Sequence, residues 1–169
     1  SGYSKQGGFE IYLNDPALAE PLWNELFKQG ADLRVRAGGP NLIERIESGL
    51  LSYGNDMNFT HNPFECGLDI YMDLDADIDA MSLKALRALR GKHVQQLVGI
   101  VFDEAVEFDD FRVEADGELV GDVRSQVWSP RYNKFLTMVM MKRDFLADNS
   151  SITIDGKLGT IVDLPFDFD

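Results

Sequence analysis

Two side chains near the start of the chain are spaced so that they could share a binding surface. Glu10 and Tyr12 stand two residues apart in the stretch Gly7-Gly8-Phe9-Glu10-Ile11-Tyr12. If this stretch is a strand, alternate side chains point to the same face, so Glu10 and Tyr12 lie together. A carboxylate in that position can accept paired N–H groups from a planar heterocycle. The plainer interpretation is an ordinary strand entered through a glycine turn, and the segment on its own favours it.

A second group of polar residues begins on a predicted helix. Arg45 lies there between Glu44 and Glu47, and alternating charges of this kind often mark only a solvated face. The helix runs into Tyr53-Gly54-Asn55-Asp56. A polar turn directly after an apolar helix end is a suitable place for a substrate-binding loop.

A third group lies in Asn62-Pro63-Phe64-Glu65-Cys66-Gly67-Leu68, where Pro63 and Gly67 predict a turn. Glu65 stands between apolar neighbours, so its carboxylate is either paired structurally or functional. Cys66 has no basic residue beside it in sequence, which favours a small buried side chain over a reactive thiol.

The common chemical signatures are missing from the sequence. It has no phosphate-binding glycine loop, no His-Glu-x-x-His and no Gly-x-Ser-x-Gly. The two histidines, His61 and His93, are far apart, so no metal site is predicted. An acidic run is expected to be a solvated turn, because its spacing does not suit a calcium loop; it comprises Asp103, Glu104, Glu107, Asp109 and Asp110. The sequence identifies no catalytic residue.

The formal net charge of the 169-residue chain is −13, which repels phosphate backbones and anionic membrane surfaces. Nucleic acid and membrane are therefore not expected partners. No apolar run reaches the roughly 18 residues needed to span a bilayer. A single cysteine excludes an internal disulfide, and a reducing cytoplasm is the simplest compartment.

The first part of the chain mixes helix and strand signals. Strands are predicted at 9–13, 33–36 and 68–72. Helices are predicted from Pro16 to a stop at Gly30, from Pro40 through about residue 51, and at 81–89. The polar residues 53–65 are expected to form an ordered loop.

From about His93 the pattern becomes all-β. Strand-like segments separated by turn signals lie at 95–102, 111–114, 118–128, 135–142, 151–154 and 158–162. Short strands at this spacing predict a small antiparallel barrel or sandwich. The fold class is therefore α+β, with a boundary near residue 92 between an α+β part and an all-β part.

In this order and spacing, the segments resemble the glycine-cleavage T-protein (aminomethyltransferase) family. That family has a Gly-Tyr-Thr-Gly-Glu-x-Gly-Phe-Glu-type stretch, an Arg-x-Glu-x-Gly helix running into Tyr-Gly-Asn-Asp, and Pro-x-Glu-x-Gly-Leu. The matches here are Gly2-Tyr3 with Gly8-Phe9-Glu10, then Arg45, Glu47, Gly49 and Tyr53–Asp56, then Pro63, Glu65, Gly67 and Leu68. Val123–Pro130 resembles the family's Ser-x-x-x-Ser-Pro strand and turn, and Leu164-Pro165-Phe166 its closing Leu-Pro-Phe. Five motifs in the same order make the resemblance specific, and they cover nearly the whole chain.

The resemblance implies a fold and a set of binding residues. Residues 1–92 would form the C-terminal part of the folate-binding core, and residues 93–169 the C-terminal β-barrel. The implied cofactor is tetrahydrofolate, with Glu10 on the pterin ring and with Arg45 and Tyr53 near the folate. Tyr3 and Tyr12 are the candidate contacts of a sulfonium substrate, because an aromatic face can hold a charge that offers no hydrogen-bond donor. The alternative is that both tyrosines are ordinary packing residues.

The departures from the family pattern bear on the substrate. Ser4-Lys5-Gln6-Gly7 replaces Thr-Gly-Glu-x, and together with Asn62–Leu68 it looks more like the dimethylsulfoniopropionate demethylase branch. The first expectation is therefore methyl transfer from a small sulfonium compound to tetrahydrofolate. The alternatives are aminomethyl transfer in glycine cleavage, and a non-catalytic fragment that keeps only part of the folate pocket.

The family's N-terminal segment, with its key aspartate, has no counterpart among these residues. The chain is therefore expected to be a piece of a longer enzyme and not competent by itself. Besides a small-molecule substrate, its expected partners are the missing N-terminal half or other copies of the same chain.

Overall fold

The computed structural model describes residues 7–39 and 41–168. By its internal contacts the chain forms two compact units, Ser1–Asn41 (unit 1) and Leu42–Asp169 (unit 2). Among the described residues, no helix is long and apolar enough to cross a membrane.

Unit 1 is built around one helix, with a 3-10 turn before it and another after it. The turns are η1 (Pro16–Leu18) and η2 (Ala31–Leu33), and the helix is α1 (Ala19–Gln29). Asp15 caps η1, because its Oδ1 accepts a hydrogen bond from the N–H of Ala17 at 2.9 Å. Gly30 ends α1 by donating its N–H to the carbonyl of Leu26. The helix predicted from the Asn-Asp-Pro start to Gly30 is confirmed.

The three strands predicted in the first part of the chain do not form. Residues 9–13 and 34–36 have no regular structure, and Leu33 lies in η2. Residues 69–71, predicted as part of a strand, form the 3-10 turn η3 (Asp69–Tyr71). Strands need a hydrogen-bonding partner, and the six strands that the described residues form pair only with one another.

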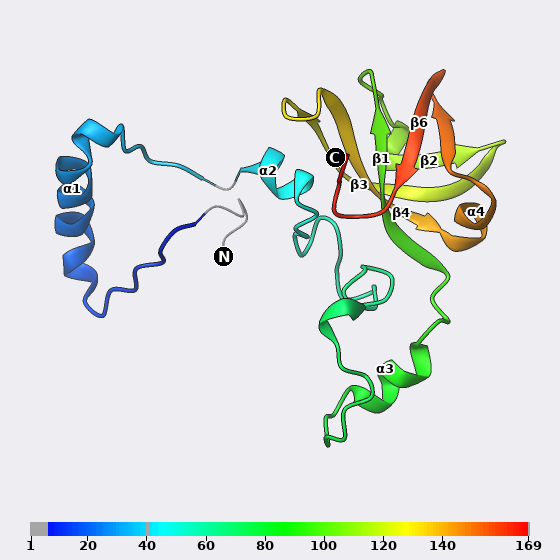
Figure 1. Cartoon of the computed structure of the whole chain (residues 1–169), viewed down its shortest axis with the longest axis horizontal. Coiled ribbons are helices and arrows are strands. Elements are labelled where there is room, and N and C mark those ends of the chain that lie inside the picture. The colour runs from blue at the N-terminus through cyan, green and yellow to red at the C-terminus, as the bar shows by residue number, and fades with distance from the viewer. Residues whose placement is uncertain (1–6, 40, 169) are drawn as a thin grey trace. The chain divides into compact units, whose positions relative to one another are not determined.

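Unit 2 contains an antiparallel six-stranded sheet in the order β2-β3-β4-β1-β6-β5. The strands are β1 (Gln95–Phe102), β2 (Arg112–Ala115), β3 (Glu118–Ser129), β4 (Lys134–Lys142), β5 (Ser151–Ile154) and β6 (Lys157–Val162). The edge strands β2 and β5 contact each other, so the sheet curls into a nearly closed barrel (Figure 1). The predicted small antiparallel barrel is confirmed, and no strand end differs from its predicted position by more than one residue.

Two tight hairpins explain why the predicted strand ends agree so well. Asp116-Gly117 joins β2 to β3 and Asp155-Gly156 joins β5 to β6, and all four residues have positive φ. Asp-Gly is a preferred pair for the two-residue turns whose twist matches that of the flanking strands. The turn residues therefore fix the strand ends in the sequence itself.

The sheet packs a hydrophobic core against each of its faces. The core inside the barrel contains Val98, Ile100 and Phe102 of β1 with Val139 and Met141 of β4. The alternate residues of the same strands face the other way and form the outer core. That core joins Leu97, Val101, Leu136, Met138 and Met140 to Ile46, Cys66 and Phe166.

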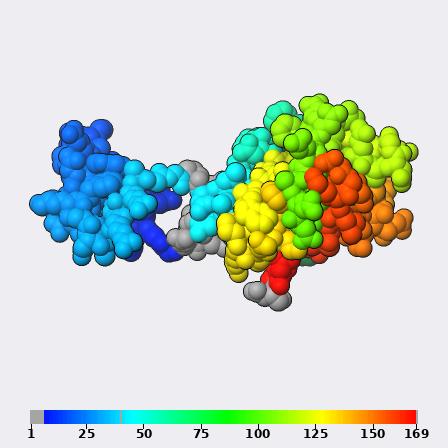
Figure 2. Space-filling view, turned by 90° about the horizontal axis from the view of Figure 1, so that it is seen from above, coloured from blue at the N-terminus to red at the C-terminus, as the bar shows by residue number. Residues whose placement is uncertain are grey.

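Residues 42–92 precede the barrel in the sequence, and side chains between Ile46 and Leu68 pack on its outer face. The segment 42–92 contains α2 (Leu42–Glu47), η3 and α3 (Leu83–Leu89), and the predicted helices at these two places are confirmed, although α2 is shorter than expected. Around α3, Phe64, Leu74 and Leu83 form a third, smaller cluster. The remaining helical elements are η4 (Asp109–Phe111) and α4 (Arg143–Asp148). Figure 2 shows the residues that follow Asn41 lying against the barrel strands. The family-based division at residue 92 stays a prediction.

Candidate functional site

A buried ion pair joins α2 to the loop that follows it. The Nη1 atom of Arg45 lies 2.5 Å from Oδ2 of Asp56, and the two side chains are 6% and 0% exposed. The same Nη1 atom also donates to the carbonyl of Leu50 at 2.9 Å. Burial of both charges leaves little water to screen their attraction. The pair therefore fixes the end of α2 against the turn at 52–57.

This ion pair is also tied to the barrel through a serine of β3. Ser125 Oγ donates to Asp56 Oδ1 at 2.5 Å and accepts from Arg45 Nη2 at 3.1 Å. The N–H of Ser52 donates to Asp56 Oδ2 at 2.7 Å. The Asp56 carboxylate thus accepts three hydrogen bonds from three separate segments.

A second link between α2 and the barrel lies two residues further along the helix. Ser129 at the end of β3 donates to Oε1 of Glu47 at 2.6 Å, and both residues are buried. Ser129 Oγ in turn accepts the N–H of Tyr132 at 3.1 Å. The polar residues of the Val123–Pro130 segment therefore position α2.

The Asn62–Leu68 segment forms the predicted turn and is held by its own side chains. Oδ1 of Asn62 accepts the N–H groups of Phe64 and Glu65, and Oε2 of Glu65 accepts the N–H of Asn62 at 2.9 Å. The Glu65 carbonyl accepts the N–H of Leu97 at 2.7 Å, which attaches the turn to β1. Glu65 is buried and hydrogen-bonded locally. Of its two predicted roles, the structural one accounts for these contacts.

Cys66 is buried in the outer core, as predicted. Burial raises the pKa of its thiol to about 11, the charge of Glu65 adds to the rise, and the charge of Arg124 opposes it. The thiolate is the reactive form of cysteine, so this thiol is unreactive near neutral pH.

Two further polar side chains meet beside this turn. Nη2 of Arg124 lies 3.3 Å from Nε2 of His61, and Nδ1 of His61 faces the N–H of Asn58 at 3.1 Å. No local pattern in the sequence pairs His61 with Arg124, which are 63 residues apart. The only signal was that Arg124 belongs to a family-like motif.

The predicted cofactor and substrate residues fall in both units. In unit 1, the Tyr12 hydroxyl donates to Oε2 of Glu10 at 2.6 Å, so these two side chains do lie together although no strand forms. That hydrogen bond, with a smaller contribution from burial, raises the pKa of Tyr12. In unit 2, Tyr53 is 66% exposed at the start of the 53–57 turn, next to the loop that Arg45 holds. Tyr3 lies outside the described residues.

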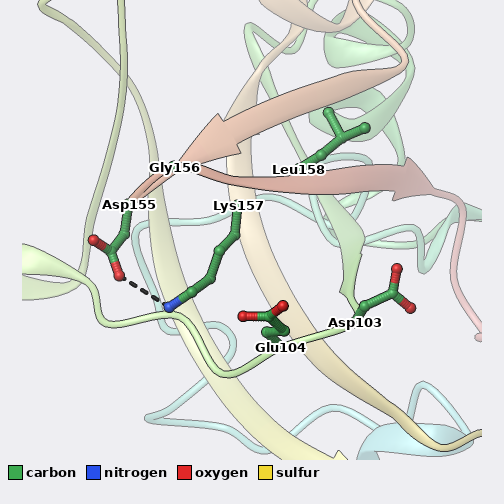
Figure 3. Close-up of a pocket in the computed structure, with 6 residues that line it drawn as sticks. All are labelled: Asp103, Glu104, Asp155, Gly156, Lys157 and Leu158. Carbon is green, nitrogen blue, oxygen red and sulfur yellow. Dashed lines mark hydrogen bonds and ion pairs between the residues drawn. The ribbon is translucent and has the colours of Figure 1, made fainter.

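A hollow at the barrel rim is lined by Asp103, Glu104, Asp155, Gly156, Lys157 and Leu158 (Figure 3). Nζ of Lys157 is already bonded to Asp155 and to the carbonyl of Ala105, and Asp103 pairs with Lys134. All five carboxylates of the acidic run 103–110 are exposed, so the prediction of a solvated turn is confirmed. The hollow therefore carries no separate site. Nowhere in the described residues do three or more His, Cys, Asp or Glu side chains gather as metal ligands would.

Comparison with known proteins gives a consistent set of relatives. The family model described as the GCVT N-terminal domain matches residues 1–76. The dimethylsulfoniopropionate demethylase DmdA of Ruegeria pomeroyi is 42% identical over 156 residues, which cover 92% of this chain and 43% of that protein. An aminomethyltransferase of Clostridium botulinum (strain Okra) is 30% identical over 149 residues, 86% of this chain and 40% of that protein.

A solved structure shows the same fold. The glycine cleavage system aminomethyltransferase T from Bartonella henselae superposes with a TM-score of 0.72, at 21% identity, over 89% of this chain and 44% of that one. The chain thus spans less than half the length of these relatives.

Proposed function

Because this chain belongs to the glycine-cleavage T-protein (aminomethyltransferase) family, we propose that it is part of a tetrahydrofolate-dependent one-carbon transferase. The proposed reaction moves a methyl group from dimethylsulfoniopropionate, or a related small sulfonium compound, to a folate nitrogen. In this reaction the bond from sulfur to methyl breaks, a bond from nitrogen to methyl forms, and the nitrogen loses a proton. The sulfur leaves as an uncharged thioether, which keeps any carboxylate of the donor.

The observation that carries the choice of donor is the difference in identity between two groups of relatives. The demethylase DmdA is 42% identical over 92% of the chain, whereas aminomethyltransferases are 29–31% identical over similar lengths. Aminomethyl transfer is the second candidate, because those relatives and the Bartonella structure share the fold.

The Glu10–Tyr12 pair supports a role in binding the proposed ligands. Glu10 is exposed, and among the described residues only one of its carboxylate oxygens is used, by the Tyr12 hydroxyl. The free oxygen and the remaining lone pairs can accept the N–H groups that a pterin ring presents. Tetrahydrofolate would supply the nitrogen that accepts the methyl group. The Tyr12 ring, 83% exposed, has a face free for the sulfonium charge, and Tyr3 is proposed for the same role.

Arg45 and Tyr53 of unit 2 are proposed as further folate-binding residues. The Arg45 guanidinium is enclosed by Asp56, Leu50 and Ser125, so its role there is to hold the turn that presents Tyr53. Loss of Arg45 would then weaken folate binding through the position of Tyr53.

Glu10→Gln tests the cofactor assignment. We would measure tetrahydrofolate binding by calorimetry on this chain and on a chimaera that joins it to the part of the Ruegeria protein it does not match. Hydrogen bonds to a charged group contribute about 1.5–3 kcal/mol, so we expect removal of the Glu10 charge to lower the affinity by at least about tenfold. Glu20→Gln, an exposed carboxylate on α1, is the matched control. An unchanged dissociation constant for Glu10→Gln removes Glu10 from the site.

Tyr12→Leu tests the donor assignment in the same chimaera. We expect the Michaelis constant for dimethylsulfoniopropionate to rise while folate affinity stays the same, because an aromatic face contributes about 0.5–2 kcal/mol to the binding of a cation. Tyr3→Leu is expected to act in the same way. If neither change affects the sulfonium substrate, aminomethyl transfer becomes the better proposal.

A further inference from the structure

Arg124 stands at an irregularity in β3. The register between β3 and β4 shifts between Val123, which faces Val139, and Ser125, which faces Met138, so Arg124 has no partner residue on β4. Bulges of this kind change the direction of a side chain and often lie beside functional sites. The neighbouring Ser125 side chain reaches Asp56, and that of Arg124 reaches His61, so both lie on the side of the sheet covered by the 52–66 loop.

The hydrogen-bond donors of Arg124 are not matched by acceptors. Its Nε–H is enclosed and has no partner among the described residues. Nη2 contacts His61 Nε2, while the N–H of Asn58 points at His61 Nδ1. A neutral imidazole has one acceptor nitrogen, so it can accept only one of these two donors. A partly buried guanidinium is therefore left with donors that nothing in the described structure satisfies.

The charge of Arg124 is likewise uncompensated. Among the described residues no carboxylate forms an ion pair with it, although the chain has a net charge of −13. Glu65, whose charge and that of Arg124 shift the pKa of the Cys66 thiol in opposite directions, uses Oε2 of its carboxylate on the N–H of Asn62. Arg45, which bonds to Ser125 next to Arg124, differs from Arg124 because its charge is paired with Asp56.

We propose that Arg124, with His61 beside it, binds the carboxylate of a small ligand. A carboxylate offers two oxygens in the plane of a guanidinium and would satisfy Nε and an Nη group together. The inference rests on the proposed function, which involves two such carboxylates. One is the propionate end of the sulfonium substrate, and the other is the glutamate tail of the folate.

NMR of the Arg124 Nε–H group in the full chain provides the test. The resonance is assigned from its loss in Arg124→Lys, and backbone spectra of each variant show that the fold is kept. The ligands added to the chain are sodium propionate, dimethylsulfoniopropionate, tetrahydrofolate and a tetrahydropterin without the glutamate tail. Propionamide serves as the uncharged control. Arg112→Gln, a paired and exposed arginine of β2, is the control variant.

We expect propionate, but not propionamide, to shift the resonance. Followed by the backbone resonances, Arg124→Gln should bind carboxylate about tenfold or more weakly. A shift with dimethylsulfoniopropionate assigns the site to the substrate. A shift with tetrahydrofolate but not with the tailless pterin assigns it to the folate. If no carboxylate moves the resonance, or if Arg124→Gln binds as tightly as the parent chain, the inference is overturned. A propionate shift without methyl transfer in the chimaera would refute the proposed reaction and leave the carboxylate site standing.

Discussion

Two ion pairs in unit 2 differ sharply in their access to water. The side chains of Arg45 and Asp56 are 6% and 0% exposed, whereas those of Arg90 and Asp75 are 55% and 81% exposed. Removing one partner of a buried pair leaves a charge that water cannot reach, but an exposed pair is replaced by hydration at little cost. The same substitution should therefore have very different effects at Asp56 and Asp75.

We predict that Asp56→Ala lowers the free energy of unfolding by about 3–5 kcal/mol. Arg45 and Ser125 would both lose their partner, and α2 would lose its tie to β3. Urea unfolding followed by circular dichroism measures the change, and Asp75→Ala should leave the midpoint unchanged. Similar effects of the two substitutions would show that the Arg45–Asp56 pair does not hold α2.

The Cys66 thiol should react slowly and show a high pKa. Its pKa of about 11, raised from 9.0, leaves about a hundredfold less thiolate near pH 8 than an unperturbed thiol has. We expect the rate of alkylation of the folded chain by iodoacetamide to keep rising until about pH 11. In the urea-unfolded chain this rate should level off near pH 9. Because unfolding restores the ordinary pKa, stability should also fall as the pH rises from about 9 to 11. Rapid labelling of the folded chain at pH 7 would show that Cys66 is accessible.

At the scale of an element, the end of α2 depends on one glycine. Gly49 has φ +62°, and its N–H donates to the carbonyl of Ile46, the position that commonly closes a helix. A Cβ at this position would lie 3.0 Å from Cα of Pro165 in the closing Leu-Pro-Phe segment. Two family motifs thus meet where only glycine fits.

Gly49→Ala should lower the free energy of unfolding by about 2–4 kcal/mol, from the left-handed backbone and the contact with Pro165 combined. Gly91 is the matched control, because it has φ +73° but open space around its Cβ position. Gly91→Ala should cost only the backbone part, about 1–2 kcal/mol. Thermal unfolding of both variants separates the two contributions, and equal losses would show that the approach to Pro165 does not matter.

The elements differed in how well the sequence predicted them. The barrel strands were predicted closely because apolar alternation and Asp-Gly turns are local signals. The segment 9–13 has the composition of a strand but no hydrogen-bonding neighbour in the described chain, and composition alone cannot reveal that. Local propensity is a weak guide wherever pairing decides the structure.

The same distinction holds for the candidate site. The closeness of Glu10 and Tyr12 could be predicted, because it follows from a spacing of two residues. The contact between Asp56 and Ser125 spans 69 positions, and nothing local in the sequence relates them. Family-like motifs marked both segments, but the hydrogen bond between them needed the three-dimensional structure.

For the whole molecule, the amount of exposed apolar surface is the leading feature. In unit 2 the exposed large apolar side chains include Tyr53, Phe59, Ile70, Tyr71, Ile78, Met81 and Val94, all in the segment before the barrel. In unit 1 no residue of α1 is buried. Large apolar patches commonly mark interfaces. The chain spans only 43% of the demethylase relative. We propose that the remaining part of such a protein covers these exposed apolar side chains.

We therefore predict that the chain, purified alone, associates with itself and does not sustain one-carbon transfer to tetrahydrofolate. Light scattering would give its mass in solution, and a folate-coupled assay its turnover. The chimaera with the remaining part of the Ruegeria protein should be active and should associate with itself less. A monomeric chain with sustained turnover would contradict this prediction.

The two cores on opposite faces of one sheet also determine which strand exchanges its amide hydrogens most slowly. β4 lies between β3 and β1, and every side chain from Leu136 to Met141 is buried, five of the six in one core or the other. The amide hydrogens of β4 can exchange with deuterium only when the neighbouring strands separate and both cores open together. Hydrogen exchange in β4 therefore runs at the pace of global unfolding, while α1 and α3, with few buried side chains, exchange through local opening.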